Sequence, residues 1–175
     1  MKVLSLNIGK LKTVSWSGRE WTTGIYKEPV LGRLAVGATG FEADSQANLE
    51  VHGGVDKAVY SYSIENYAYW KQQGRGDLPY GTFGENLTTE GFDEGEIHIG
   101  DRFQVGTALL EAVSPRRPCA KLGLIFQDPG MVKEFKEAGR PGIYFRVIES
   151  GEIGAGDLIE KVRDSPDSPT VVSTL

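Results

Sequence analysis

The residue in this chain with the widest chemical range is its single cysteine, Cys119. It ends the stretch Pro115-Arg116-Arg117-Pro118-Cys119, in which two prolines restrict the backbone on its amino-terminal side. Arg116 and Arg117 place positive charge nearby, and positive charge favours an anionic sulfur. Such a sulfur could act as a soft ligand to a metal, as a nucleophile or as a persulfide carrier. The alternative is a small buried hydrophobic residue, the commoner state of a lone cysteine.

A second stretch that could do chemistry is His52-Gly53-Gly54. Two glycines allow backbone amides to approach an anion closely. His52 could donate a hydrogen bond to the same ligand, and Lys57 could add a point charge just beyond it. The alternative is a plain turn before a strand with His52 on the surface, and a short glycine pair does not separate the two.

A third stretch is Phe83-Gly84-Glu85-Asn86-Leu87, which places a carboxylate and an amide directly after a glycine. The amide of Asn86 offers both a donor and an acceptor, which suits the edge of a pterin-like heterocycle. The alternative is a turn closed by the side chain of Asn86, and the pentapeptide alone fits both interpretations.

Composition narrows the possible functions. The formal charge of −5 argues against a general nucleic-acid binder, because phosphate recognition needs a surplus of lysine and arginine. No apolar run approaches the roughly 20 residues that span a bilayer, and the amino terminus is too short and polar for a secretory signal. A single cysteine permits no internal disulfide, so we expect a cytoplasmic protein. One cysteine and two histidines are also too few for a typical zinc site.

The elements that must position these residues are mostly short strands. The 175 residues suit one domain, and the 23 glycines indicate many tight turns. We predict strands at 3–8, 20–26, 30–36, 58–62, 97–101, 102–105, 108–113 and 142–149, with a last strand starting at 156. We predict helices at 63–73, 120–126 and 131–138. The predicted fold class is a β-rich α+β domain, barrel-like with a few peripheral helices, over residues 1–163. The polar segment 164–175 is predicted to be a disordered tail.

Six stretches together, in this order, resemble the MOSC family, the domain also found at the carboxyl end of molybdenum cofactor sulfurases. The resemblance is to its YiiM-like branch in particular. The stretches are 23–30, 44–48, 51–54, 83–87, 99–101 and 115–122. Two positions depart from the pattern of that branch, which usually has glycine where Ala43 stands and proline or a similar residue where Val55 stands.

The resemblance implies a MOSC-type β-barrel that holds a molybdenum cofactor (molybdopterin) in a cleft. Cys119 would be the catalytic residue and the protein ligand to molybdenum, for which a soft sulfur donor is suitable. Arginine and lysine side chains would hold the phosphate or the pyranopterin oxygens. The cofactor-binding residues expected are Lys27, His52, Gly53, Gly54, Lys57, Glu85, Asn86, Arg116 and Arg117, with Glu85 and Asn86 nearer the ring system.

The resemblance also implies an oxidoreductase that removes oxygen from N-hydroxylated compounds such as hydroxylaminopurine and amidoximes. One cysteine cannot ligate an iron–sulfur cluster, and no flavin or haem motif is present, so a separate reductase would supply the electrons. We expect a monomer or homodimer that binds neither nucleic acid nor membrane. One alternative is a sulfur-carrier or cofactor-transfer domain with a persulfide on Cys119. Another is a binding module in which Cys119 is buried and inert.

Overall fold

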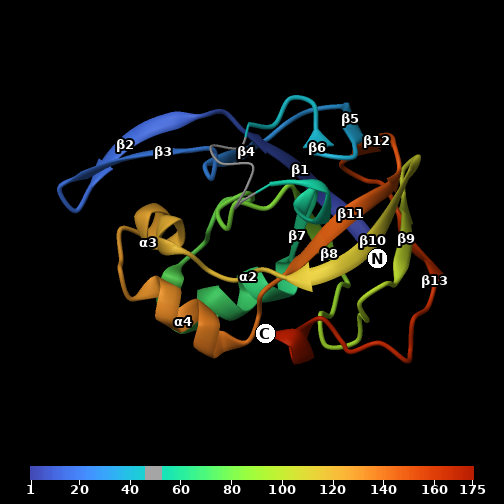
Figure 1. The fold of residues 1–175 in the computed structure, drawn as a ribbon. Coiled ribbons are helices and arrows are strands. Elements are labelled where there is room, and N and C mark those ends of the chain that lie inside the picture. Colours follow the sequence, from blue (N-terminus) through green and yellow to red (C-terminus); the bar gives the residue numbers. More distant parts are fainter. Residues whose placement is uncertain (46–52) are drawn as a thin grey trace.

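The computed structural model describes residues 1–45 and 53–175, and its main element is an eight-stranded sheet (Figure 1). Its strands are β1 (Lys2–Gly9), β4 (Lys27–Pro29), β7 (Val59–Ser63), β8 (Leu87–Glu90), β9 (Arg102–Val105), β10 (Ala108–Pro115), β11 (Ile143–Glu149) and β13 (Ile159–Arg163). The strand order is β13-β9-β10-β11-β7-β8-β1-β4. Strands β7 and β8 pair in parallel, and the other neighbours pair antiparallel.

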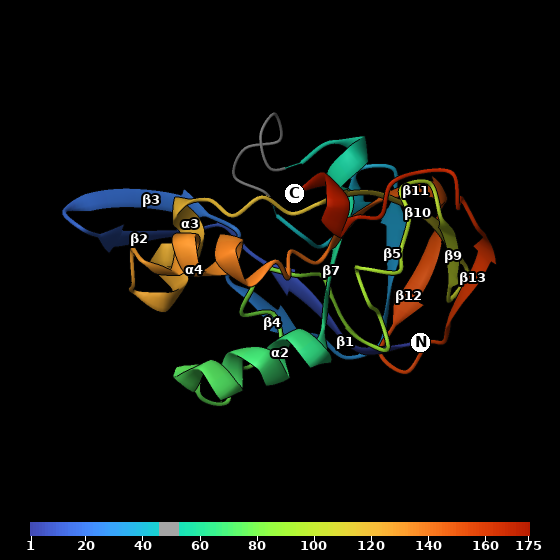
Figure 2. The same cartoon turned by 90° about the horizontal axis from the view of Figure 1, so that it is seen from below.

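Two smaller sheets accompany the main one. The first joins β12 (Gly151–Gly154), β5 (Arg33–Gly37) and β6 (Gly40–Phe41) in that order. The second is a hairpin of β2 (Lys12–Trp16) and β3 (Arg19–Thr23), which projects away from the rest of the fold (Figures 1 and 2). Its two-residue turn has positive φ at both Ser17 and Gly18, the geometry that matches the twist of the paired strands.

The predicted β-rich α+β class is confirmed, but the expected barrel does not close. In the part of the chain that the structure describes, β13 and β4 are the two ends of the large sheet and do not pair with each other. Strand β4 is three residues long and ends at Pro29, which has no N–H to donate to a further strand. The large sheet therefore has two edges.

The helices α2 (Ile64–Trp70), α3 (Ala120–Phe126) and α4 (Met131–Ala138) lie within the three helical stretches expected, and α3 and α4 have the predicted bounds. They gather beside one end of the large sheet (Figure 1). Short helical turns cover Val55–Lys57 (η1), Lys71–Arg75 (η2) and Val172–Thr174 (η3). Each described helix is too short or too polar to cross a membrane.

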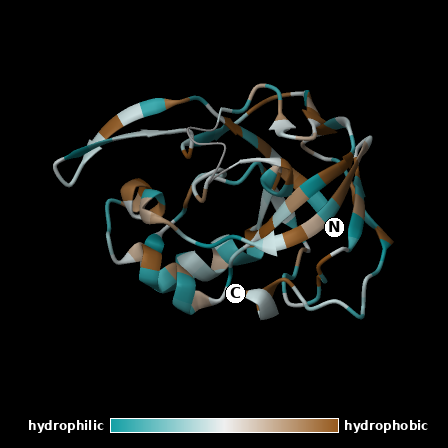
Figure 3. Cartoon of the chain, viewed as in Figure 1, coloured by the Kyte–Doolittle hydropathy of each residue, from teal (hydrophilic) through white to brown (hydrophobic). Residues whose placement is uncertain are grey.

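The core has two parts. Buried hydrophobic residues alternate with partly exposed residues along most of β10 and β11, so that one face of these strands lies in the larger apolar cluster (Figure 3). A second, aromatic cluster lies between the helices and the sheet. It consists of Tyr60, Tyr62, Tyr67, Trp70, Phe83, Leu122, Met131 and Phe135. We call it the helix-side cluster. It anchors both α3 and the loop before β8.

The segment 164–175, expected to be a disordered tail, is instead packed against the sheet. The Val171 side chain is fully buried in the larger cluster, and its N–H donates to the Ile97 carbonyl at 2.8 Å. The Ile99 N–H donates to the Pro169 carbonyl at 3.0 Å. One apolar side chain and a few backbone hydrogen bonds fix this segment, and its polar composition hides them. Residues 97–101, expected as a strand, form a turn that meets the segment in one isolated bridge at Thr170.

Candidate functional site

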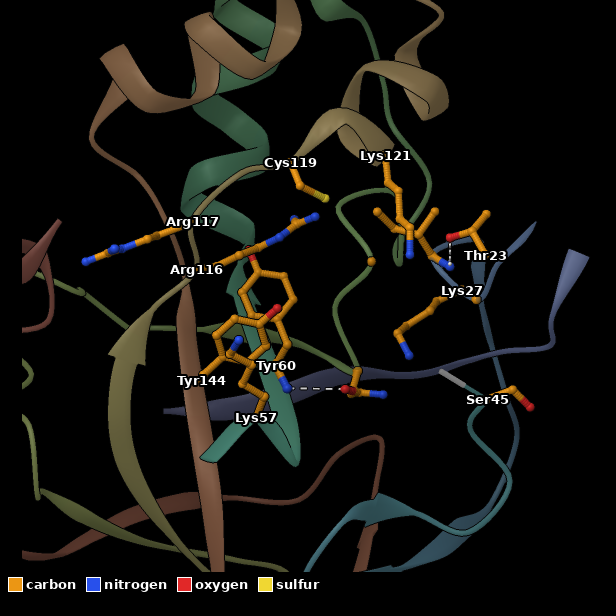
Figure 4. Close-up of a pocket in the computed structure, with 14 residues that line it drawn as sticks. Thr23, Lys27, Ser45, Lys57, Tyr60, Arg116, Arg117, Cys119, Lys121 and Tyr144 are labelled. Carbon is orange, nitrogen blue, oxygen red and sulfur yellow. Dashed lines mark hydrogen bonds between the residues drawn. The ribbon is translucent and has the colours of Figure 1, made fainter. Parts of the chain in front are cut away.

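A cleft of about 630 Å³, partly open to solvent, lies where β4, the loop before β8 and the segment after β10 meet (Figure 4). Its lining contains five of the chain's cationic side chains. They are Lys27, Lys57, Arg116, Arg117 and Lys121. No aspartate or glutamate is among the described residues that line it. Since the chain as a whole carries a charge of −5, this local excess of cations favours an anionic ligand.

Cys119 lies on the wall of this cleft, directly before α3. Its backbone is extended (φ −131°, ψ 172°), and its carbonyl accepts a hydrogen bond from the Leu122 N–H at 2.9 Å. Leu122 is fully buried in the helix-side cluster, and Pro115, at the other end of the segment, pairs with Ile143 of β11. The thiol is therefore positioned from both sides. It is partly exposed, which is not the buried position that the inert alternative requires.

Arg116 is the most unusual charge in the site. Its side chain is only 5% exposed, and it donates a hydrogen bond to the Phe83 carbonyl. The guanidinium carbon lies 5.0 Å from the ring centroid of Tyr60. No described aspartate or glutamate lies within 4.0 Å as an ion-pair partner for Arg116. In Figure 4 the guanidinium points toward Cys119, whereas Arg117 points the opposite way.

The surroundings of Arg116 keep it charged. Burial alone would lower its pKa, but Tyr60 and Tyr144 outweigh burial and raise the pKa of Arg116 above its ordinary value. Burial also raises the pKa of Tyr144, so its phenol stays protonated and can donate a hydrogen bond. Tyr60 and Tyr144 are direct partners on neighbouring strands, with ring centroids 5.1 Å apart.

Lys27 and Asn86 line the cleft, and both contact Asp44, which does not line it. The Lys27 ammonium donates to the Asp44 carboxylate, with 7% and 3% of the two side chains exposed. Asp44 also accepts from Asn86 Nδ2 at 2.9 Å and from the Gly9 N–H at 2.8 Å. Burial lowers the pKa of Lys27, and the Asp44 carboxylate opposes that change. The Tyr60 N–H donates to Asn86 Oδ1 at 3.2 Å, so the amide is largely engaged within the wall.

Glu85, expected beside the cofactor ring, does not line the cleft. Its carboxylate is fully buried and accepts hydrogen bonds from the Tyr67 phenol, the Gly81 and Phe83 N–H groups and the Thr88 hydroxyl. Burial raises the pKa of Glu85. The carboxylate shapes the loop that carries the Phe83 carbonyl to Arg116. A glycine signals a possible ligand site in the sequence, but it does not show to which side the next side chain points.

The glycine-pair stretch is only partly described. His52 lies outside the described residues. Gly53 and Gly54 do not line the cleft, and Gly54 (φ 87°) leads into the turn η1. Lys57, at the end of that turn, does line it.

Sequence reasoning missed several cleft residues. These are Thr23, Gly24, Ile25, Ser45, Tyr60, Gly84, Lys121 and Tyr144. Six of them, Thr23, Gly24, Ile25, Ser45, Gly84 and Lys121, lie within the stretches that carry the family resemblance, and Thr23 opens the first of these. Tyr60 gives no local signal, because its alternation with Tyr62 is the pattern of core packing.

A second hollow, of about 1300 Å³, adjoins the cleft. The two share Lys57, Arg117, Cys119 and Tyr144. Cys119 therefore stands on the boundary between the cationic cleft and a second space.

Comparison with known proteins gives the family. Residues 48–160 match the MOSC domain. The uncharacterized protein YflK of Bacillus subtilis is 40% identical over 158 residues, which cover 90% of this chain and 72% of that protein. A protein of Gibberella moniliformis named "Reductase" is 35% identical over 161 residues, 90% of this chain but only 28% of the fungal protein. The crystal structure of YiiM from Geobacillus stearothermophilus matches with a TM-score of 0.80 at 33% identity, covering 98% of this chain and 80% of that one. Sequence and fold thus agree, and the chain belongs to the MOSC domain family.

Proposed function

We propose that the cationic cleft binds a molybdenum cofactor with the Cys119 sulfur as the protein ligand to molybdenum. We further propose that the protein reduces N-hydroxylated compounds with electrons from a separate reductase. Membership of the MOSC family and the fungal relative named a reductase support an oxidoreductase.

The observation that carries the proposal is the buried charge of Arg116. A buried cation without a carboxylate partner costs several kcal/mol, about 3 to 5 in measured cases, unless another negative charge offsets it. The phosphate of the cofactor would supply that charge, and a guanidinium binds phosphate through two parallel hydrogen bonds. Lys57 and Lys121 would add positive charge around it. The residues present therefore fit an anionic cofactor.

The donor set also fits the metal. Among the described residues, Cys119 is the only one with a sulfur atom that lines the cleft, and a soft sulfur donor suits molybdenum. When bound, the cofactor would supply two electrons that, with two protons, convert an N–OH group to N–H and release water. The chain's own part is to fix the sulfur between Pro115 and the buried Leu122 and to hold the phosphate on Arg116. The protonated phenol of Tyr144 would offer a hydrogen bond to the substrate.

Metal content tests the proposal. The protein would be purified from a host that makes the cofactor, and molybdenum would be measured by elemental mass spectrometry in wild type, Cys119→Ser and Ala120→Ser. The Ala120→Ser variant is the matched control, because it adds the same hydroxyl one residue along, at an exposed position, and keeps the thiol. We expect near-stoichiometric molybdenum in wild type and control, and little in Cys119→Ser.

Activity would be assayed with benzamidoxime and chemically reduced methyl viologen, so that no particular partner reductase is needed. Wild type without molybdenum, from a host that makes the cofactor, would overturn the proposal. Sulfane sulfur on Cys119 of that protein would then favour the sulfur-carrier alternative.

A further inference from the structure

The second hollow beside Cys119 has a different chemistry from the cationic cleft. Most of its surface is apolar, and its lining includes Ile99, Val113 and three prolines, Pro115, Pro118 and Pro169. The ring of Tyr144 completes it. Such walls suit a flat apolar body, because they can cover both faces of a ring without losing side-chain freedom.

Two cations stand on this hollow, Lys57 and Arg117. Figure 4 shows that Arg117 points away from Arg116 and so away from the centre of the cationic cleft. Within the described part of the chain no carboxylate side chain lines the hollow. A ligand there would therefore meet apolar walls and positive charge together.

The carboxyl-terminal segment supplies one wall, through Pro169 and Thr174. The buried Val171 fixes this segment from within, and the Ser165 N–H donates to Asp101 Oδ1 at 2.7 Å. The Ile99 N–H donates a hydrogen bond to the Pro169 carbonyl, so two lining residues from separate parts of the chain are joined directly. The buried Val171 and these hydrogen bonds therefore hold the carboxyl-terminal wall in place.

Resting on the proposed function, we propose that this second hollow is the substrate subsite. It selects N-hydroxylated compounds that have a flat apolar body and an anionic substituent, such as a carboxylate or a phosphate. With the cofactor in the cationic cleft and its metal on Cys119, the second hollow is a neighbouring space that Cys119 also lines. The N–OH group lies toward Cys119, the ring lies against the prolines, and the anion faces Lys57 and Arg117.

The expected preference is modest, since these cations are partly open to water. Partly exposed ion pairs change an equilibrium by about twofold to fivefold each, so two of them together give a preference of about fourfold to 25-fold for the anionic ligand. The preference falls as ionic strength rises, because salt screens such pairs.

Binding of matched probes tests the subsite without any turnover. The probes are benzamide and para-carboxybenzamide, which share the ring and lack the N–OH group. Their affinities for the purified protein would be measured by ligand-observed NMR titration in wild type, Thr174→Glu and Ser173→Glu. Thr174 lines the hollow, whereas the neighbouring Ser173 is exposed and does not. We expect the preference for the carboxylate to disappear in Thr174→Glu and to remain in Ser173→Glu, with thermal unfolding confirming that both variants fold.

A preference that survives Thr174→Glu would overturn the proposal, because the carboxylate would then bind elsewhere, for example at Arg116. Equal affinities of the two probes in wild type would overturn it too. If the protein reduced benzamidoxime and para-carboxybenzamidoxime with equal kcat/KM, the proposed function would stand and the proposed subsite would be wrong. If the protein bound para-carboxybenzamide more tightly than benzamide but reduced neither amidoxime, the hollow would select anions and the proposed function would be wrong.

Discussion

Lys27 and Asp44 form an ion pair inside the wall of the cationic cleft, with less than a tenth of either side chain exposed. The same carboxylate ties Gly9 of β1 and Asn86 of the loop before β8 to the pair. One buried anion thus connects three separate stretches of the chain, and it neutralises Lys27 as a ligand for anions. The cleft's remaining attraction for an anion comes mainly from Arg116 and the cations near Cys119.

Asp44→Asn should therefore destabilise the protein strongly. The substitution leaves the Lys27 ammonium buried without its counter-charge, which typically costs about 3 to 5 kcal/mol. Urea unfolding measures the loss. The control is Glu28→Gln in the exposed pair Lys12–Glu28, where we expect a loss within about 1 kcal/mol. Similar losses in the two variants would show that burial of the Lys27–Asp44 pair has no energetic consequence.

Arg116→Lys should weaken anion binding although the charge is kept. A lysine ammonium is a point charge that lacks the planar fork, and it cannot both donate to Phe83 and stack on Tyr60. Loss of one charge-assisted hydrogen bond, about 1.5 to 3 kcal/mol, corresponds to a drop in phosphate affinity of about tenfold or more. Calorimetric titration with inorganic phosphate measures it, with Arg163→Lys at an exposed position of β13 as control. Unchanged phosphate affinity in Arg116→Lys would remove Arg116 from the anion site.

Much of the fold could be predicted from local patterns. Helices α3 and α4 have the predicted bounds because their apolar residues follow helical spacing. Strand β2 was missed, since its side chains are exposed or only half-buried and leave no buried apolar face to read. The order of the segment 164–175 depends on one buried side chain, Val171, among polar neighbours. A single apolar residue carries no periodicity, so composition alone favours disorder there.

The candidate site likewise has some residues that local sequence patterns predict and others that they do not. Stretches such as the one ending at Cys119 can be recognised from the sequence, because their rigid and charged residues are neighbours in the chain. The pairing of Tyr60 with Tyr144 joins residues far apart in the sequence, and it became visible only with the strand register. Glu85, expected nearer the cofactor ring, is buried and does not line the cleft, because the direction of a side chain after a glycine turn depends on the packing around it.

Acid should release the carboxyl-terminal wall of the second hollow. Burial alone would raise the pKa of Asp101, but hydrogen bonds from the His98 and Ser165 N–H groups and from Lys161 lower this pKa below its ordinary value of 3.8. A carboxyl whose pKa is lower in the folded state stabilises the fold above pH 3.8, and this contribution is lost as the pH falls through the folded pKa.

Hydrogen exchange at the Val171 amide follows that release. In wild type we expect the protection of this amide to be independent of pH, once the intrinsic exchange rate is corrected for, down to about pH 4, and to fall below it. Asp101→Asn removes the charge at every pH, so protection should already be reduced at neutral pH. The His98 imidazole lies 3.9 Å from the same carboxylate, and His98→Asn serves as the control for its contribution. Full protection of Val171 in Asp101→Asn would show that the segment is held without the charge of Asp101.

Glu85→Gln separates a carboxylate that shapes a loop from one that contacts a ligand. The two Glu85 oxygens accept from Gly81, Phe83, Thr88 and Tyr67, with the Phe83 N–H alone on Oε2. A glutamine that keeps the first oxygen must turn its NH₂ group toward the Phe83 N–H, and two donors then face each other in a buried place. The unmade hydrogen bond should cost about 1 to 3 kcal/mol, partly offset because burial disfavours the charge of Glu85.

Urea unfolding would measure that loss, and hydrogen exchange would show where it acts. We expect the amides of Gly81 and Phe83 to lose protection in Glu85→Gln. They should keep it in Glu94→Gln, which changes another buried carboxylate that does not line the cleft. If Glu85→Gln instead kept wild-type stability and loop protection while losing molybdenum, Glu85 would contact the cofactor in a conformation that this structure does not contain.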